Sequence, residues 1–95
     1  MEDIQVQLQE SESKGKYFIE IDGKQASEMT FSKAGTDRII IDHTEVDPEF
    51  RGMGLGEKMV HQAVADARSK GFKILPLCPF AHSVFEKQEE IRDVL

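Results

Sequence analysis

The chain has 95 residues, with 12 Lys and Arg against 18 Asp and Glu, so its formal net charge is −6. A protein that binds nucleic acid through its phosphates needs a basic surface, and this charge argues against that class. The length suits one domain, and no apolar run approaches the roughly 20 residues that a membrane span requires. The acidic, alternating residues 1–10 differ from a signal peptide. We therefore expect one small cytoplasmic domain over residues 1–95.

The first half of the chain alternates apolar and polar residues, which is the pattern of half-buried strands. This alternation predicts four strands, over residues 4–8, 17–21, 27–33 and 38–46. Asp22-Gly23 is typical of a two-residue hairpin turn, because glycine takes the positive φ that such turns demand. Consecutive strands joined by short turns predict an antiparallel meander.

The apolar period changes after Asp47-Pro48. Residues 55–70 repeat apolar side chains every three or four positions, which predicts an amphipathic helix that ends at Gly71. Residues 72–77 predict a short buried strand, and residues 80–90 predict a last helix. The expected order is ββββαβα, an α+β fold, in which the strand–helix–strand unit joins parallel neighbours.

Three alternating glycines occupy the turn between the predicted fourth strand and first helix, Arg51-Gly52-Met53-Gly54-Leu55-Gly56. Glycines leave backbone N–H groups exposed there, and the helix dipole adds positive charge, so the turn suits a phosphate or pyrophosphate. Arg51 adds a full charge. The dinucleotide fingerprint would need glycine in place of Glu57, and no Walker loop is present. The alternative is that the glycines serve only a tight turn and close packing.

This turn lies in a longer motif. The stretch Val46-Asp47-Pro48-Glu49-Phe50-Arg51-Gly52-Met53-Gly54-Leu55-Gly56 resembles the acetyl-CoA-binding motif V-x-P-x-x-[RQ]-G-x-G-x-[GA] of the GNAT superfamily of N-acetyltransferases and matches every fixed position. With His43-Thr44-Glu45-Val46 and Cys78-Pro79-Phe80, the chain resembles the short, single-domain subfamily called YjdJ-type. That subfamily often closes with a His-Pro-Glu-Tyr run, where this chain reads Gln88-Glu89-Glu90-Ile91.

The resemblance implies a mostly antiparallel sheet whose fourth and fifth strands splay apart, with the pantetheine arm of acetyl-CoA in the gap. It implies that the backbone of residues 51–56 holds the pyrophosphate, that Val46 binds pantetheine through its main chain, and that Pro79 and Phe80 adjoin the cofactor. Acetyl-CoA would be the cosubstrate, without a metal. The acceptor would be an unknown amine, and the acidic surface favours a small amine, a polyamine or a basic peptide.

Cys78 follows the predicted fifth strand and directly precedes a predicted helix. A helix N-terminus can lower the pKa of a thiol and make it more reactive. Acetyl transfer from a thioester to an amine needs a base, an oxyanion stabiliser and a proton for the leaving thiolate. Cys78 could donate that proton, or accept the acetyl group and pass it on. The alternative is that it only packs in the core, as free cysteines commonly do.

His43 and Glu45 are further catalytic candidates, and by strict alternation they share a strand face with Ile39 and Ile41. His43 could be the general base, and Glu45 could orient it or bind an amine. The alternatives are a hydrogen-bonded core histidine and a solvated charge. Tyr17, the one tyrosine, lies in an early strand. The tyrosine acid that the superfamily often carries after the fifth strand is therefore missing from that place.

Positive charge for the adenine–ribose–phosphate end of CoA could come from Arg51, Lys58, Lys73 and Lys87. His61 and His82 lack acidic or cysteine partners at ligand spacing, so a metal site is not expected. Two other function classes stay open: a CoA or acyl-CoA sensor without efficient catalysis, and an interaction domain with a purely structural turn. We expect a monomer or weak dimer that binds neither nucleic acid nor a membrane.

Overall fold

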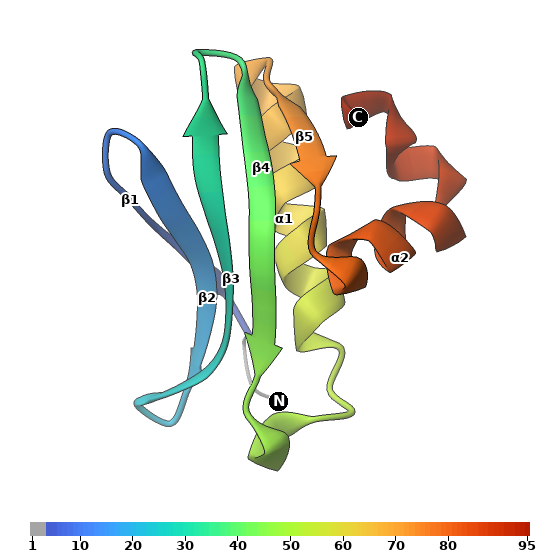
Figure 1. Ribbon diagram of the computed structural model, residues 1–95. Coiled ribbons are helices and arrows are strands. Elements are labelled where there is room, and N and C mark those ends of the chain that lie inside the picture. Colours follow the sequence, from blue (N-terminus) through green and yellow to red (C-terminus); the bar gives the residue numbers. More distant parts are fainter. Residues whose placement is uncertain (1–3) are drawn as a thin grey trace.

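The computed structural model describes residues 4–95 and has the predicted α+β architecture (Figure 1). Its sheet has the order β1-β2-β3-β4-β5. The strands are β1 (Val6–Glu10), β2 (Lys14–Ile21), β3 (Lys24–Ala34), β4 (Arg38–Val46) and β5 (Lys73–Pro76). The helices are α1 (Leu55–Lys70) and α2 (Pro79–Lys87), with 3₁₀ turns η1 (Pro48–Phe50) and η2 (Glu89–Val94). Residues 1–3 lie outside the described residues. They belong to the expected domain and to the N-terminal stretch that is expected not to be a signal peptide.

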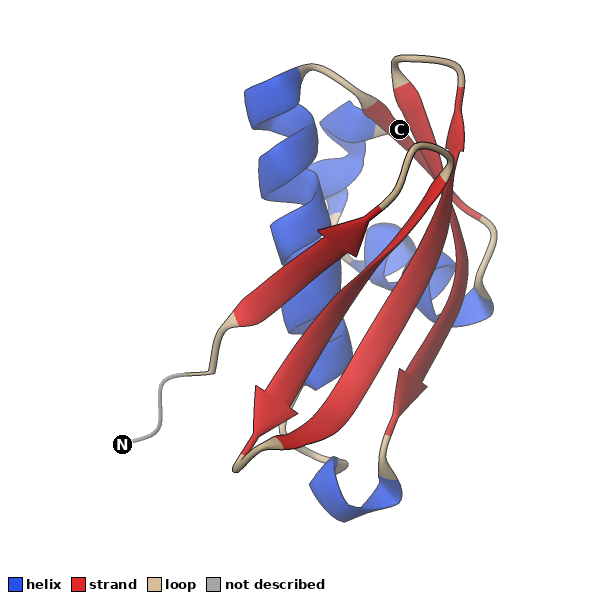
Figure 2. Cartoon of the chain, turned by 90° about the vertical axis from the view of Figure 1, so that its left-hand side faces the viewer, coloured by secondary structure: helices blue, strands red, loops and turns tan. Residues whose placement is uncertain are grey.

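The predicted meander and crossover are both confirmed. Strands β1 to β4 pair as antiparallel neighbours, and β5 pairs in parallel with β4 after α1. Figure 2 shows the helices against one face of the sheet, whereas the other face is uncovered. Among the described residues, neither helix has the length and apolar character needed to cross a membrane.

The core lies between the sheet and the helices. The buried side of α1 is the apolar stripe that the sequence predicts, namely Leu55, Met59, Val60, Ala63, Val64 and Ala67. Alternate residues of the strands meet it, including Tyr17, Ile19, Met29, Phe31, Ile39 and Ile41. Gly71 caps α1 with a left-handed φ of 81°, as expected.

Several boundaries differ from the sequence prediction. Strand β1 runs two residues later than the predicted 4–8, β2 and β3 begin three residues earlier than predicted, and β5 is shorter than the predicted 72–77. The last helix ends at Lys87, because Gln88 adopts extended backbone angles (φ −123°, ψ 90°) and the chain continues as η2. The Arg92 guanidinium holds this break by donating to the carbonyl oxygens of Phe85 and Glu86.

Strand β4 contains an extra residue that the sequence prediction missed. Thr30 pairs with His43 and Phe31 pairs with Ile41, so Asp42 has no partner on β3. This is a β-bulge, which reverses the alternation of side chains along the bulged strand. The Asp42 carboxylate accepts a hydrogen bond from the Ser32 hydroxyl (2.7 Å), which fixes the bulge across the two strands.

A partly buried hydrogen bond joins the sheet to α1. The Tyr17 hydroxyl donates to Oδ2 of Asp66 (2.8 Å), and Oδ1 of Asp66 accepts from Gln62 (3.1 Å). Burial, together with the Asp66 carboxylate, raises the pKa of Tyr17 well above its ordinary value. The hydroxyl therefore stays protonated and keeps its bond across the working pH range.

Tyr17→Phe is expected to lower the free energy of unfolding by about 1–2 kcal/mol, because Asp66 loses a hydrogen bond in a partly buried setting. Denaturant unfolding measures this change. Asp66→Asn and the double variant complete a double-mutant cycle, in which the pair should show a coupling energy. Equal unfolding midpoints for the wild type and Tyr17→Phe would contradict the assigned bond.

Candidate functional site

Strands β4 and β5 separate after a short parallel ladder. Their pairing ends at Ile41 and Pro76, and the next contact is a hydrogen bond from the Cys78 amide to the Ile41 carbonyl (3.0 Å). Strand β4 continues through residues 42–46, and within the described chain no backbone hydrogen bond joins these residues to residues 77–95. The predicted splay is confirmed. We call the free side of residues 42–46 the open β4 edge.

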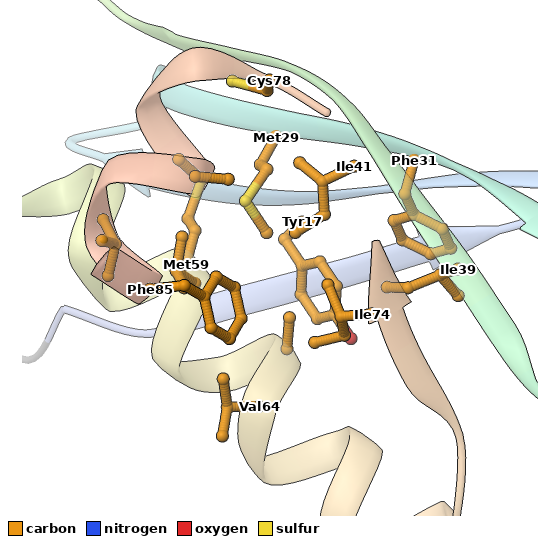
Figure 3. Close-up of a cluster of buried hydrophobic side chains, with 14 of the residues drawn as sticks. Tyr17, Met29, Phe31, Ile39, Ile41, Met59, Val64, Ile74, Cys78 and Phe85 are labelled. Atoms are coloured by element: carbon orange, nitrogen blue, oxygen red, sulfur yellow. The ribbon is translucent and has the colours of Figure 1, made fainter. Parts of the chain in front are cut away.

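Cys78 lies at the point where the open β4 edge begins. It is the N-cap residue of α2, and Pro79 takes the first helical position. The side chain is 4% exposed, and Figure 3 places it at the margin of the core cluster. Its Sγ donates to Oγ1 of Thr44 (3.3 Å). The thiol thus faces β4, where the fourth and fifth strands part.

The bulge decides which β4 side chain meets Cys78. The sequence prediction that His43 and Glu45 share a face with Ile39 and Ile41 is wrong, because the extra residue at Asp42 turns both of them to the uncovered face. There His43 Nε2 lies 3.6 Å from Glu45 Oε2, and both side chains are more than 60% exposed.

Thr44 is the site residue that the sequence analysis missed. It pairs with the buried Met29, so it points to the core side. The position of Thr44 could have been found from the spacing of Ile41 and Val46, which are an odd number of positions apart. Both residues pack against the core. Two residues at an odd spacing can share one strand face only if an extra residue lies between them.

The glycine turn leads from η1 into α1. Gly52 (φ 87°) and Gly54 (φ 72°) are both left-handed, and open space surrounds the position that a Cβ would take at either one. Gly54 is the N-cap of α1 and supplies no side-chain bond. Within residues 4–95, the amides of residues 52–57 donate to no other group. These amides and the helix dipole are suited to bind an anion.

Both positive and negative side chains lie near the glycine turn. Arg51 is exposed beside it, whereas Glu57 adds a negative charge in the first turn of α1. Lys58 is exposed one position further on. Lys73 begins β5, opposite Arg38, and therefore lies at the other end of the ladder, where its Nζ donates to the Asp93 carbonyl (2.9 Å). It is not placed to reach a ligand at the turn. Lys87 ends α2 and is exposed.

A third glycine joins the turn to the helix that follows Cys78. Gly56 is buried, and a Cβ there would lie 2.5 Å from the Phe80 ring. Phe80 itself stays 39% exposed, and Met53 in the turn is 40% exposed. The first turns of α1 and α2 therefore pack directly together, and apolar surface remains open beside them.

Gly56→Ala is expected to lower stability by about 1–2 kcal/mol, because the Phe80 ring must move and the cost of overpacking outweighs the better helix propensity of alanine. Denaturant unfolding gives the change. Phe80→Leu in the same chain should recover part of the loss by making room, and Phe80→Leu alone is the control. A Gly56→Ala protein that is as stable as the wild type would contradict this packing.

The larger cavities lie elsewhere. One of about 570 Å³ is lined by β1, β2 and the bulge residue Asp42, and Cys78 lines none of the four that we find. One of about 400 Å³ adjoins the turn, with Glu28, Glu45, Asp47 and Arg51 in its wall.

The remaining histidines are exposed. His61 Nε2 lies 2.7 Å from Oε1 of Gln88. His82 has an acidic partner that the sequence analysis overlooked, with Nδ1 3.0 Å from Oε1 of Glu86. No group of three His, Cys, Asp or Glu residues in the described chain is placed to hold a metal ion.

Residues 16–94 match the protein family described as GCN5-related N-acetyl-transferase. The solution structure of a GCN5-like protein from Staphylococcus aureus has a TM-score of 0.71 and 31% identity, covering 93% of this chain and 85% of that one. The chain therefore belongs to the GCN5-related N-acetyltransferases, and the GNAT resemblance of its glycine motif is confirmed at that level. No protein of curated function matches the sequence.

More distant structures share the fold alone. A ribosomal-protein-alanine N-acetyltransferase from Brucella melitensis has a TM-score of 0.69 and 16% identity over 81% of this chain. A protein from Bacillus anthracis, solved in complex with acetyl coenzyme A, has a TM-score of 0.58 and 18% identity over 70% of this chain. The chain spans 62% of the first protein and 39% of the second.

Proposed function

We propose that this protein binds acetyl-CoA along the open β4 edge and transfers the acetyl group to a primary amine by way of Cys78. The observation that carries the proposal is the position of Cys78, whose amide bonds to Ile41 where β4 loses its β5 partner. The free amides of residues 52–57 lie beyond the other end of the same edge. The motifs at residues 43–46 and 78–80 support membership of the YjdJ-type subfamily.

The proposed cofactor path follows the exposed backbone. The pyrophosphate binds the amides of the glycine turn beside Arg51, with Lys58 as a second positive charge. Residues 42–46 rise about 3.3 Å each, so the edge offers roughly 15 Å of unpaired backbone to an extended pantetheine arm. Val46 lies at the turn end of this path. Exposed Met53 and Phe80 supply apolar contacts, and Pro79 lies beside Cys78 at the thioester end.

The proposed chemistry has two balanced steps. The Cys78 thiolate attacks the thioester carbonyl carbon, a new S–C bond forms, and CoA leaves as a thiolate that takes up the proton released by Cys78. A neutral amine then attacks the acetyl-cysteine, and the thiolate of Cys78 leaves. The proton that the nitrogen loses returns to that thiolate, which gives an N-acetyl product and the free enzyme.

The acceptor amine is proposed to approach from the uncovered sheet face and to reach Cys78 through the gap where β4 and β5 part. His43 and Glu45 lie there on β4, and the carboxylates of Glu28, Glu45 and Asp47 line a neighbouring cavity of about 400 Å³. Negative charge of this kind attracts an ammonium group, and His43 can take its proton. This arrangement supports a cationic amine as acceptor.

A CoA titration followed by backbone NMR tests the binding step. We expect the amides of residues 51–56 to shift, and no shift at millimolar CoA would overturn the proposal. Intact mass after incubation with acetyl-CoA tests the transfer step, with an added acetyl group on Cys78 as the expected result. Thiol release with a panel of amines then identifies the acceptor class.

A second candidate is a CoA or acyl-CoA sensor without efficient turnover. The observation that favours it is that Cys78 is 4% exposed and lines none of the described cavities. A sensor would show the amide shifts but neither acetyl-Cys78 nor thiol release with any amine.

A further inference from the structure

The bulge in β4 brings a hydroxyl group against the thiol that the proposed function uses. We propose that Thr44 is a positioning residue for Cys78. When Cys78 is a thiol, its S–H donates a hydrogen bond to the Thr44 hydroxyl oxygen. When Cys78 is a thiolate, the Thr44 hydroxyl turns and donates a hydrogen bond to the sulfur. This inference rests on the proposed function for its catalytic meaning. The contact itself can be tested without acetyl-CoA.

The hydrogen-bond geometry supports both states of this contact. Oγ1 of Thr44 lies 3.3 Å from Sγ of Cys78, and Thr44 is only partly buried. Within residues 4–95, the Thr44 hydroxyl donates to no other acceptor. Its proton is therefore free to turn toward a negatively charged sulfur, and a hydrogen bond to the charged form of a group favours that form.

The bulge is what makes this contact possible. If β4 were a regular strand in which Asp42 also paired with β3, His43 would point to the core side and Thr44 to the uncovered face. The bond from the Ser32 hydroxyl to the Asp42 carboxylate holds the bulge in place. The Cys78 amide, bonded to Ile41, fixes the other side of the same contact.

Charged groups on the neighbouring elements do not reach the thiol. On α2, His82 pairs with Glu86 in solvent. On β4, His43 and Glu45 occupy the opposite face of the sheet. On β5, the Nζ of Lys73 donates to the Asp93 carbonyl. At the start of α1, Glu57 and Lys58 are exposed. Further along α1, Asp66 bonds to Tyr17, Arg68 pairs with Asp93, and Lys70 is exposed at the C-terminal end. In the described chain Thr44 is the one side chain that bonds to Sγ.

The test follows the ultraviolet absorbance of the thiolate as a function of pH in the full chain. Cys78 is the one cysteine and Tyr17 the one tyrosine. Because the pKa of Tyr17 is raised, tyrosinate does not contribute absorbance over the pH range of the thiol titration. Thr44→Val removes the hydroxyl at almost constant shape and should raise the midpoint by about one pH unit, a tenfold loss of thiolate at a fixed pH. Thr44→Ser keeps a hydroxyl and should titrate as the wild type does.

Thr30→Val is the matched control. Thr30 lies on β3 opposite His43, on the uncovered face, so the same substitution there should leave the midpoint unchanged. A Thr44→Val midpoint equal to the wild type, or an equal shift in Thr30→Val, overturns the inference. A shift that is specific to Thr44→Val in a protein that never forms acetyl-Cys78 would uphold the contact and reject the proposed transfer.

Discussion

Replacing Cys78 with alanine is expected to lower acetyl transfer at least about a hundredfold, whether the thiol carries the acetyl group or protonates the CoA thiolate. The residue bonds to β4 through its backbone amide, which the substitution keeps. We therefore expect CoA affinity to stay within about twofold of the wild type, since the glycine turn that is proposed to bind the phosphates is untouched. Steady-state thiol release and CoA titration measure the two quantities separately.

His43→Ala is the comparison variant, since His43 lies on β4 close to the Ile41 carbonyl that bonds to Cys78, but faces the uncovered side. It should still form the acetyl adduct on Cys78 and should lose only the later transfer to an amine. A Cys78→Ala protein that turns over an amine at the full rate would reject any chemical role for the thiol. Full turnover by His43→Ala would remove that residue from the acceptor side.

Replacing Gly54 with alanine is expected to weaken CoA binding at least about tenfold, which is a loss of about 1.4 kcal/mol of binding free energy. Gly54 has a φ of 72°, and an alanine that adopts a negative φ would turn the amides of residues 52–57 away from their common direction. The strain should also lower the stability of the fold by about 1–2 kcal/mol. Calorimetric titration measures the affinity.

Gly23→Ala separates these two effects. Gly23 has a φ of 75° with open space at its Cβ position, so it carries the same backbone strain in the hairpin between β2 and β3. We expect a similar loss of stability and unchanged CoA affinity. Equal loss of affinity in both variants would mean that the turn matters only through the stability of the fold.

The sequence predicts the fold well because strong periodic patterns govern it. The six apolar positions of α1, the hairpin at Asp22-Gly23 and the cap at Gly71 each follow from local physics and appear as expected. The end of α2 was less predictable, since it depends on a tertiary feature. Arg92 folds back onto carbonyl oxygens of the preceding helix, and no local pattern signals that contact.

The candidate site was predicted only in part. The glycine turn and Cys78 carry recognisable local signals, and the structure places them at the two ends of the open β4 edge. The faces of His43 and Glu45 were assigned incorrectly and Thr44 was missed, because strict alternation assumes a regular strand. The bulge at Asp42 depends on pairing with β3, which a reading of one strand does not capture.

The contact between Gly56 and Phe80 has a further consequence for how changes spread through the protein. Helix α1, which begins at the turn proposed to bind phosphate, and helix α2, which begins after Cys78, contact each other directly through Gly56 and Phe80. A ligand that tightens the first should therefore also protect the amides at the start of the second from hydrogen exchange. Substitutions where α1 meets α2 would then change both the affinity for CoA and the rate of acetyl transfer. Redesign for a new acceptor is therefore best confined to the uncovered face of the sheet.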